Sequence, residues 1–462
     1  MPILYPDFEN STVPLYHQLY SAIKHSVNEG ILASGEKLPS IRKLSEELKL
    51  SRTTIENAYQ QLCIEGYLIN KPQSGYYTAD LSLGHAQLKK TDNSAVNVSI
   101  KRDYSFIFST SSVDPNAFRV DLWRRYLRNV LNEPDGLFSY GESQGEYSLR
   151  KTVSEYCTRV RGVISTPERI VIGAGIQPLL QILCGLLQSS VDSIGMETPF
   201  FEHARQIFSD CSLNVLPIPA DKDGASVEYL RKNGIRCAYI NPSAVNDSGS
   251  PMPMKRRLEF IDWTAEGGIL IEDDNNGELR YGSRPVPAIQ GLAPDRNIVY
   301  LGTFSKVLMP AVRISYMVLP EELAKKYVNC RKNYNQTASK TEQLALAQYI
   351  REGHLERQLR KMRKIYSRKG ELLIECLQKY FPNAQITLQE TALRVLLRPF
   401  LNVDSATLVK LAEASGIYVK AYGKNENGQV SIGFSGIAQE QIADGIKSLH
   451  NAWKSLANSQ SI

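Results

Sequence analysis

Lys306 stands where a lysine amine could do covalent chemistry. It follows residues 297–301, an apolar run typical of a buried strand, and two hydroxyl side chains lie beside it, Thr303 and Ser305. A lysine forms an imine with an aldehyde only through its neutral amine, and burial favours that neutral form. An isolated lysine in a loop is usually exposed to solvent, so the prediction of a reactive lysine depends on what accompanies it.

Three further features accompany Lys306 at predicted strand ends. Arg313 follows seven positions later and can hold a phosphate through paired hydrogen bonds. Asp273 follows the strand predicted at 268–272, where a carboxylate can keep a pyridine nitrogen protonated. Another strand ends in a glycine turn that begins a helix, where free backbone N–H groups bind phosphate. These amides belong to Gly175, Ile176 and Gln177. Together the four features predict a site for pyridoxal 5′-phosphate (PLP).

The elements that must position these residues alternate along the chain beyond Tyr104. Amphipathic helical patterns are separated by short apolar runs, at 169–173, 237–240, 268–272 and 297–301. This alternation predicts an α/β fold in which helices cover both faces of a mostly parallel sheet. The predicted site residues therefore stand at the ends of strands of one sheet.

Residues 1–80 follow a different plan. Apolar residues recur at helical spacing over 15–27, and two more helices are predicted to begin after the N-cap residues Ser40 and Ser51. The third helix is predicted to place on one face the residues Ile55, Ala58, Tyr59, Leu62 and Ile64. Strand-like runs at 67–69 and 75–78 flank a turn, which predicts a β-hairpin. This order of elements is that of a winged helix-turn-helix.

The helix after Ser51 carries side chains that could contact DNA. In a helix-turn-helix the second helix lies in the major groove and its N-terminal residues reach base edges; here these are Ser51, Arg52, Thr53 and Thr54. Arginine can bind guanine with two parallel hydrogen bonds. Arg42 could hold the DNA backbone, and Gly75 at the hairpin tip would let the chain approach the minor groove. Residues 1–80 carry seven Lys and Arg against nine Asp and Glu, however, so charge alone favours a protein-interaction module.

The composition sets outer limits on the protein class. A chain of 462 residues suggests two to four domains. No run is apolar for long enough to span a bilayer, and the first residues lack the pattern of a signal peptide. The seven cysteines form no C-x-x-C pair, so neither a metal site nor a disulfide framework is predicted, and a cytoplasmic location fits best. The net charge of +6 permits nucleic-acid binding without arguing for it.

The first 80 residues closely resemble the DNA-binding domain of the GntR family. The matching stretches extend nearly from end to end of this domain: Val13-Pro14-Leu15-Tyr16-x-Gln18-Leu19, Lys37-Leu38-Pro39-Ser40-x-Arg42-x-Leu44, Leu50-Ser51-Arg52-Thr53-Thr54 and Gly66-Tyr67-Leu68. The resemblance implies binding to double-stranded DNA, and it outweighs the charge balance of the domain.

Residues 105–462 resemble the fold type I aminotransferases, and the whole chain resembles the MocR family of regulators, which fuse a GntR-type domain to that fold. The resemblance implies a Schiff base between PLP and Lys306, with Asp273 on the pyridine nitrogen and Arg313 on the phosphate. It further implies roles for four other groups: the amides of Gly175, Ile176 and Gln177 around the phosphate, Phe201 stacked on the ring, Asn246 on the phenolic oxygen, and Tyr140 reaching a partner subunit's phosphate. A homodimer follows, in which each DNA-binding domain can rest on the other subunit.

The chain departs from the family's pattern around the ligand. Asn275 and Asn276 stand where a tyrosine usually follows the acid pair, and Ile176 stands where the phosphate cup often carries a hydroxyl. Ser431 takes the position at which many relatives have an arginine that grips the substrate's carboxylate. His203 stands where GABA-responsive relatives have an arginine, and a surface histidine is the more common reading of such a position. These departures predict a site that keeps the cofactor and lacks the ordinary amino-acid grip.

Besides an interaction scaffold that binds no PLP, two functions remain open from the sequence. One is a regulator whose aminotransferase-like domain senses PLP, or an adduct of PLP with an amino acid, and is tied to vitamin B6 or D-alanine metabolism rather than to GABA. The other is an active aminotransferase that carries a DNA-binding domain, since half-reactions are chemically feasible. The missing arginine at Ser431 argues against efficient turnover of common amino acids.

The predicted domain boundaries follow from these patterns. We expect the winged helix-turn-helix at 1–80, a linker at 81–104 and the PLP-binding effector domain at 105–462, with a smaller C-terminal subdomain from about 325 onward. A basic run within the last of these either extends a DNA track or forms a solvated helix face. Its members are Arg357, Arg360, Lys361, Arg363, Lys364, Arg368 and Lys369.

Overall fold

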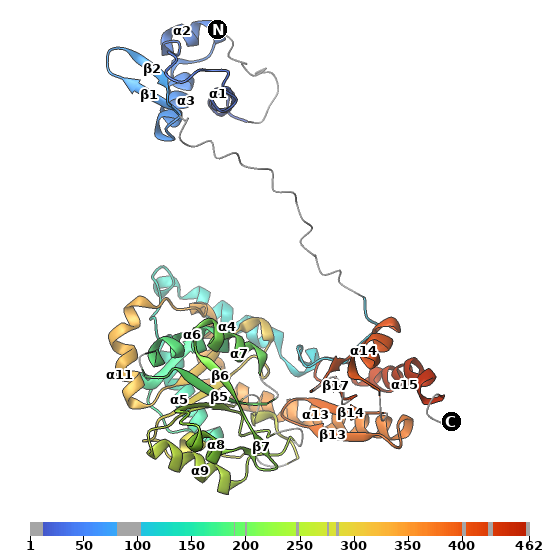
Figure 1. The fold of residues 1–462 in the computed structure, drawn as a ribbon. Coiled ribbons are helices and arrows are strands. Elements are labelled where there is room, and N and C mark those ends of the chain that lie inside the picture. The colour runs from blue at the N-terminus through green and yellow to red at the C-terminus, as the bar shows by residue number, and fades with distance from the viewer. Residues whose placement is uncertain are drawn as a thin grey trace. The chain divides into compact units, whose positions relative to one another are not determined.

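The computed structural model describes residues 13–80, 103–188, 190–198, 201–245, 249–274, 277–282, 286–399, 403–423 and 428–458. The chain divides between residues 101 and 102 into two compact units, each with its own helices and strands (Figure 1). Most of the linker predicted at 81–104 lies outside the described residues.

The first unit consists of three helices followed by a hairpin. Its elements are α1 (Leu15–Asn28), α2 (Ile41–Leu48), α3 (Arg52–Ile64), β1 (Leu68–Lys71) and β2 (Gly75–Thr78). Ser40 and Ser51 cap α2 and α3 as predicted: their hydroxyls accept hydrogen bonds from the backbone N–H groups of Lys43 (3.3 Å) and Thr54 (3.1 Å). The strands pair antiparallel, with Leu68 opposite Thr78. The helix-turn-helix and its hairpin wing are therefore formed as the sequence predicts.

The core of the first unit is apolar and is shared by its three helices, with Leu19, Leu44 and Tyr59 fully buried. The prediction that Ile64 belongs to this buried face was wrong, because its side chain is 80% exposed. An α-helix turns by about 100° per residue, so Ile64 points away from the face on which Leu62, two residues earlier, is buried.

A seven-stranded sheet lies at the centre of the larger lobe of the second unit. Its order is β4 (Ile170–Gly173), β12 (Ser315–Val318), β11 (Ile298–Thr303), β10 (Ile269–Asp273), β9 (Cys237–Ile240), β5 (Ser193–Glu197) and β6 (Asn214–Ile218). Only β12 is antiparallel to its neighbours. The prediction of a mostly parallel sheet in an α/β fold is confirmed.

Helices cover both faces of this sheet because its strands are apolar on both sides. Along each strand, successive side chains point to opposite faces: Val171 and Val299 pack with one layer, Ile172 and Tyr300 with the other. The first layer contains α6 (Ile176–Leu187), α7 (Glu202–Asp210) and α11 (Glu321–Cys330). The second contains α4 (Val120–Asn132), α5 (Tyr147–Arg161), α8 (Val227–Lys232), α9 (Met254–Ala265), α10 (Ile289–Leu292) and α12 (Lys340–Arg351).

A smaller lobe of the second unit is built on a four-stranded antiparallel sheet (Figure 1). Its strands are, in spatial order, β13 (Gln385–Gln389), β14 (Arg394–Arg398), β17 (Val430–Gly433) and β16 (Lys420–Ala421), and its helices are α13 (His354–Tyr380), α14 (Ser405–Ala414) and α15 (Ile442–Asn458). Two two-stranded pairs complete the fold: β3 (Phe106–Ile107) with β15 (Ile417–Tyr418), and β7 (Ala220–Asp221) with β8 (Gly224–Ala225). The pairing of β3 with β15 ties the start of this unit to the smaller lobe.

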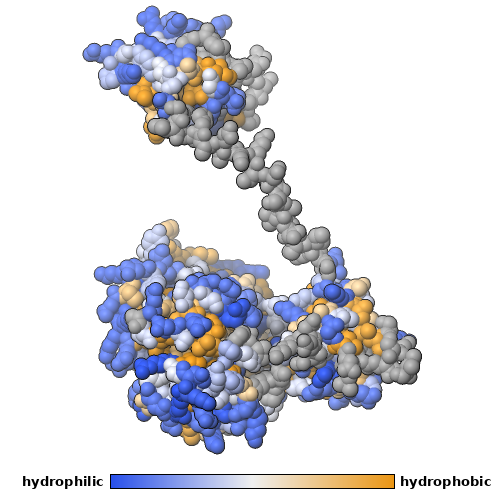
Figure 2. Space-filling model, viewed as in Figure 1, coloured by the Kyte–Doolittle hydropathy of each residue, from blue (hydrophilic) through white to orange (hydrophobic). Residues whose placement is uncertain are grey.

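The surface of the second unit is mainly polar. In the view of Figure 2, hydrophilic residues cover most of its visible face and apolar residues gather in limited patches. Among the described helices, none combines the length and the apolar character needed to cross a membrane. One member of the basic run is not at the surface: Lys369 is buried and pairs with Asp114 at 2.5 Å, so it can belong neither to a DNA track nor to a solvated face.

Candidate cofactor site and nucleic-acid interface

The large sheet brings most of the predicted cofactor residues to one edge. Parallel strands β4, β10 and β11 end there, at Gly173, Asp273 and Thr303, and the antiparallel strand β12 begins there at Ser315. Ligands of open α/β sheets bind at this edge, where the carboxyl ends of parallel strands meet.

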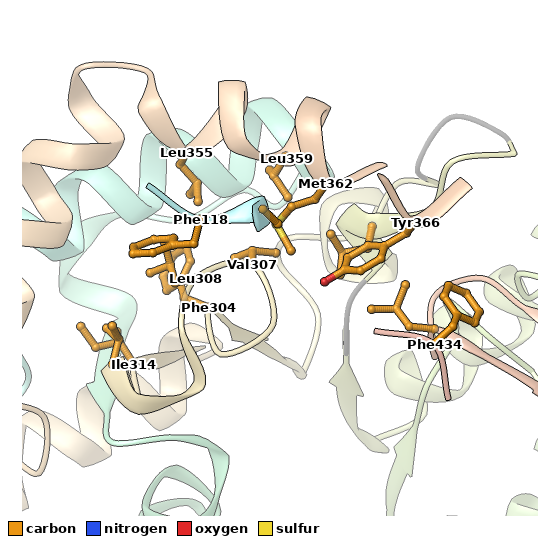
Figure 3. Packing of buried hydrophobic residues seen from close by; sticks show 14 of the residues in the cluster. Phe118, Phe304, Val307, Leu308, Ile314, Leu355, Leu359, Met362, Tyr366 and Phe434 are labelled. Carbon is orange, nitrogen blue, oxygen red and sulfur yellow. The ribbon is translucent and has the colours of Figure 1, made fainter. Parts of the chain in front are cut away.

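Lys306 lies in the loop that connects β11 to β12. The loop is closed at its base, because Thr303 pairs with Ser315 and the N–H of Phe304 donates to the carbonyl of Ile314 (3.0 Å). Its apolar side chains pack among residues of α13 (Figure 3): Phe304, Val307 and Leu308 from the loop, and Leu355, Leu359 and Met362 from the helix. The loop that carries Lys306 is therefore held in place by strand pairing at its base and by apolar packing against α13.

The amine of Lys306 is partly buried and donates a hydrogen bond to the backbone carbonyl of Thr110. Burial, and secondarily the positive charge of Lys420, lowers the pKa of Lys306 from 10.5 to about 8. The neutral fraction of this amine at pH 7 is consequently about 300-fold that of an ordinary lysine. Neither Thr110 nor Lys420 was predicted, since both are distant from Lys306 in the sequence.

The hydroxyls beside Lys306 hold each other. Thr303 Oγ1 accepts hydrogen bonds from Ser315 Oγ (2.8 Å) and from the backbone N–H of Ser305 (3.2 Å), and it donates to Ser305 Oγ (3.2 Å). These bonds fix the turn that presents the lysine.

Asp273 is buried at the end of β10 and accepts a hydrogen bond from the hydroxyl of Tyr239. Burial, and secondarily the charge of Asp274, raises the pKa of Asp273 to about 6, although the Tyr239 hydrogen bond acts to lower it. No local pattern in the sequence indicated a role for Tyr239. The pairing of β9 with β10 explains the contact. Tyr239 lies opposite Ile271, and Ile271 is two residues before Asp273, so all three side chains point to the same face of the sheet.

Gly175 and Arg313 form a close pair at the start of α6. A β-carbon on Gly175, whose φ is +94°, would lie 2.5 Å from the Arg313 Nη2, so only glycine lets the guanidinium approach the backbone there. Arg313 itself has φ +51°, a conformation costly for a non-glycine residue. The helix begins at Ile176, so the amides of Ile176 and Gln177 lie in its first turn without intrahelical acceptors. These donors form a cup suited to a phosphate.

A second buried carboxylate, Asp274, lies beside Asp273 and anchors this edge of the sheet. It accepts hydrogen bonds from Arg161, from Ser243 Oγ (2.7 Å) and from the Tyr300 hydroxyl (2.6 Å). Burial acts to raise the pKa of Asp274, but the Arg161 guanidinium and these hydrogen bonds hold it below its ordinary value. The members of this network come from four separate parts of the chain, so no local pattern in the sequence indicated it.

The remaining predicted cofactor residues are less constrained. Phe201 precedes α7 with its ring 41% exposed, and His203 meets it edge-on with ring centroids 5.6 Å apart. Tyr140 is fully exposed within this chain. Asn246, and also Asn275 and Asn276, lie outside the described residues.

Within the described part of the chain, no group of three or more His, Cys, Asp or Glu side chains could hold a metal ion.

The predicted DNA-contacting residues cluster at the start of α3. Arg52 and Thr53 are exposed there, whereas the hydroxyls of Ser51 and Thr54 bond each other at 2.8 Å and so serve the helix cap. Arg42 on α2 is exposed and pairs with Glu46 at 3.1 Å. Gly75 begins β2 with φ +109°, next to the turn of the wing.

Comparisons with known proteins agree with this two-part plan. Residues 114–449 match the family described as aminotransferase class I and II, and residues 15–77 match the bacterial regulatory proteins of the gntR family. The HTH-type transcriptional regulator YdeL of Bacillus subtilis (strain 168) is 36% identical over 96% of this chain and 97% of its own. The HTH-type pyridoxine biosynthesis transcriptional regulator PdxR of Corynebacterium glutamicum is 31% identical over 84% and 83%.

A solved aminotransferase shares the fold of the second unit. The kynurenine aminotransferase of Pyrococcus horikoshii, in complex with PMP, superposes with a TM-score of 0.67 and 25% identity, and covers 77% of this chain and 92% of its own. Part of this chain has no equivalent in that structure, as expected if the enzyme lacks a counterpart of the first unit.

Proposed function

The chain belongs to the aminotransferase class I and II family over most of its length and carries a gntR-type DNA-binding domain in front of it, and from this premise we propose that it is a transcription regulator that binds PLP and changes its DNA binding when a small molecule reaches the cofactor site. Coupling of about 1–3 kcal/mol between the two sites is enough to switch a promoter.

The arrangement of Lys306, Asp273 and Arg313 at one sheet edge carries the proposal. PLP would supply an aldehyde for imine formation and a pyridine ring that withdraws electrons. Lys306, with its lowered pKa, would hold the aldehyde carbon. Asp273 would face the ring nitrogen, and Arg313 with the first-turn amides of α6 would hold the phosphate. The close approach of the Arg313 guanidinium to Gly175 fits such an anion site.

We propose that the effector is PLP itself or an adduct of PLP with an amino acid, in vitamin B6 or D-alanine metabolism. The name of PdxR, a regulator of pyridoxine biosynthesis, supports the first choice by similarity. Ser431, which stands where many relatives carry an arginine, disfavours an ordinary aminotransferase substrate. Calorimetric titration with PLP, D-alanine, D-alanyl-D-alanine, GABA and taurine tests the proposal. Heat from PLP or from the D-alanine ligands is expected, and a response to GABA or taurine alone would refute both choices.

A working aminotransferase is the second candidate, because the cofactor residues are nearly complete and the lowered pKa of Lys306 raises the neutral fraction of its amine. Incubation of the purified protein with amino acids and a keto-acid acceptor separates the two functions. Robust turnover would support an aminotransferase function, whereas slow, substoichiometric conversion would support the regulator function.

The pH dependence of cofactor loading follows from the pKa of Lys306. Only the neutral amine attacks an aldehyde, so the rate at which the cofactor-free protein acquires the imine absorbance should rise with pH and level off above about 8. A free alkylamine measured alongside should continue to gain rate toward 10.5, the ordinary lysine value. A protein midpoint near that of the alkylamine would contradict the predicted burial of Lys306.

Arg52→Ala tests the DNA-contacting surface. A bidentate arginine–guanine contact is worth about 1–3 kcal/mol, so affinity for the promoter should fall by roughly 5- to 150-fold while binding to random DNA changes little. Arg231→Ala, which removes an exposed arginine of α8, is the matched control. Fluorescence anisotropy with promoter and random duplexes gives both affinities. An equal loss on both duplexes would assign Arg52 to the phosphate backbone instead.

We also propose a homodimer, since Tyr140 is predicted to reach a partner's phosphate and both Phe138 and Tyr140 are exposed within one chain, at 90% and 104%. Light scattering measures the mass in solution. A monomer at micromolar concentration would remove this role for Tyr140.

A further inference from the structure

The face of the small sheet that carries Ser431 is turned toward the chain segment that contacts Lys306. Ser431 lies on β17, two residues before Gly433, so both point to the same face of the sheet. A β-carbon on Gly433 would lie 2.6 Å from the backbone nitrogen of Thr110. The carbonyl of Thr110 accepts the hydrogen bond from the Lys306 amine. This face of β17 therefore borders the cofactor site.

Lys420 projects from the same face. It lies on β16 directly opposite Ser431, and opposed residues of antiparallel strands share a face. The side chain of Lys420 makes no hydrogen bond or ion pair with any residue that the structure describes, and its positive charge lowers the pKa of the Lys306 amine. Ser431 is short and only 8% exposed, so no long side chain from β17 occupies the space in front of Lys420.

A second cation stands on this face in a different setting. Arg394 of β14 lies opposite Gly433. Its guanidinium stacks over the Tyr422 ring, 4.5 Å from the centroid, and its Nε donates to Gln389 at 2.6 Å. The Arg394 side chain thus already interacts with Tyr422 and Gln389, whereas the Lys420 side chain makes no such interaction with the described residues.

We propose that Lys420 binds the carboxylate of an amino acid that enters the cofactor site, in place of the arginine that many relatives carry at the position of Ser431. The positive charge would then lie on β16 instead of on the neighbouring strand β17. Because Lys420 is the residue opposite Ser431, the charge would still face the cofactor site from the small lobe. The inference rests on the proposed function, because the amino group would engage the cofactor held by Lys306.

The exchange of arginine for lysine has a consequence for selectivity. Arginine holds a carboxylate through two parallel hydrogen bonds in a fixed plane, whereas lysine is a point charge on a flexible stem. We therefore expect modest affinity and tolerance of different distances between amine and carboxylate, so that glycine, β-alanine and D-alanine bind within about tenfold of one another.

The test uses the full chain loaded with PLP and follows the cofactor's absorbance during titration with glycine, β-alanine and D-alanine, and with ethylamine, which lacks a carboxylate. Lys420→Gln should weaken the binding of the amino acids by roughly tenfold or more and leave ethylamine unchanged. Lys420→Arg should restore binding, and Lys447→Gln, at an exposed lysine of α15, should behave as the wild type.

The outcomes separate this inference from the proposed function. If the wild type does not acquire the imine absorbance, the proposed function fails first. If it does, and Lys420→Gln binds the amino acids as tightly as the wild type, or no amino acid binds more tightly than ethylamine, the role of Lys420 is overturned while PLP binding stands. Loss of selectivity in Arg394→Gln with full selectivity in Lys420→Gln would transfer the role to Arg394.

Discussion

Replacement of Lys306 by alanine should abolish the imine absorbance of the PLP-loaded protein and the response of its DNA binding to effector. Lys306 lies at the sheet edge to which Asp273 and Arg313 also belong, its amine is partly buried, and its pKa is lowered to about 8. Alanine removes the amine but leaves the loop anchored, because the neighbours Phe304 and Val307 pack into the core. We expect complete loss of the covalent adduct without loss of the fold.

Borohydride reduction followed by peptide mass spectrometry checks this prediction at the level of the residue. In the wild type, one peptide that contains Lys306 should carry the reduced cofactor, and in Lys306→Ala none should. Lys447→Ala serves as the matched control for a lysine on the surface of the same unit. Labelling of another lysine at wild-type levels in Lys306→Ala would place the cofactor elsewhere and remove the basis of the proposed function.

Replacement of Arg161 by leucine should lower the free energy of unfolding of the second unit by about 3–5 kcal/mol at neutral pH, because it leaves the charge of Asp274 buried without its counterion. Both side chains are almost completely buried, and Arg161 also donates to Ser243 Oγ (3.0 Å). Chemical denaturation followed by tryptophan fluorescence measures this loss, since all three tryptophans, at 123, 263 and 453, lie in the second unit.

The pH dependence of this loss has a definite sign. The pKa of Asp274 is depressed in the folded protein, so the pair stabilises the fold above the ordinary carboxyl pKa and loses its effect as pH falls. The deficit of Arg161→Leu should therefore be largest near pH 7 and shrink in acid. Arg231→Ala, which breaks the exposed pair with Glu266, should have little effect on the free energy of unfolding. Equal effects from the two substitutions would contradict the buried network.

Paired substitution distinguishes loss of the ion pair from loss of packing. Arg161→Leu with Asp274→Leu removes both charges together, and a buried ion pair replaced by apolar residues is often close to neutral in stability. The double variant should be more stable than Arg161→Leu alone. If it is less stable by the sum of the single losses, the two side chains do not act as a pair.

The sequence by itself determined the features that depend on neighbours along the chain. Ser40 and Ser51 cap their helices because an N-cap hydroxyl bonds a backbone N–H only three residues away. The hairpin and the apolar strands follow from the same short-range patterns. Because parallel strands end at one edge, the positions of Lys306 and Asp273 after strands were enough to predict that they share an edge of one sheet. The error at Ile64 was also local, because a turn of about 100° per residue already places Ile64 opposite the face of Leu62.

Only the tertiary structure decided which distant groups touch the site. Thr110 meets the Lys306 amine across 196 residues of sequence, Tyr239 meets Asp273 across 34, and Arg161 meets Asp274 across 113. These contacts depend on strand order and on how the small lobe packs against the large one, which periodicity does not encode. Lys420 illustrates the reason: the sequence shows a serine where an arginine is usual, but the antiparallel register alone places a lysine across from it.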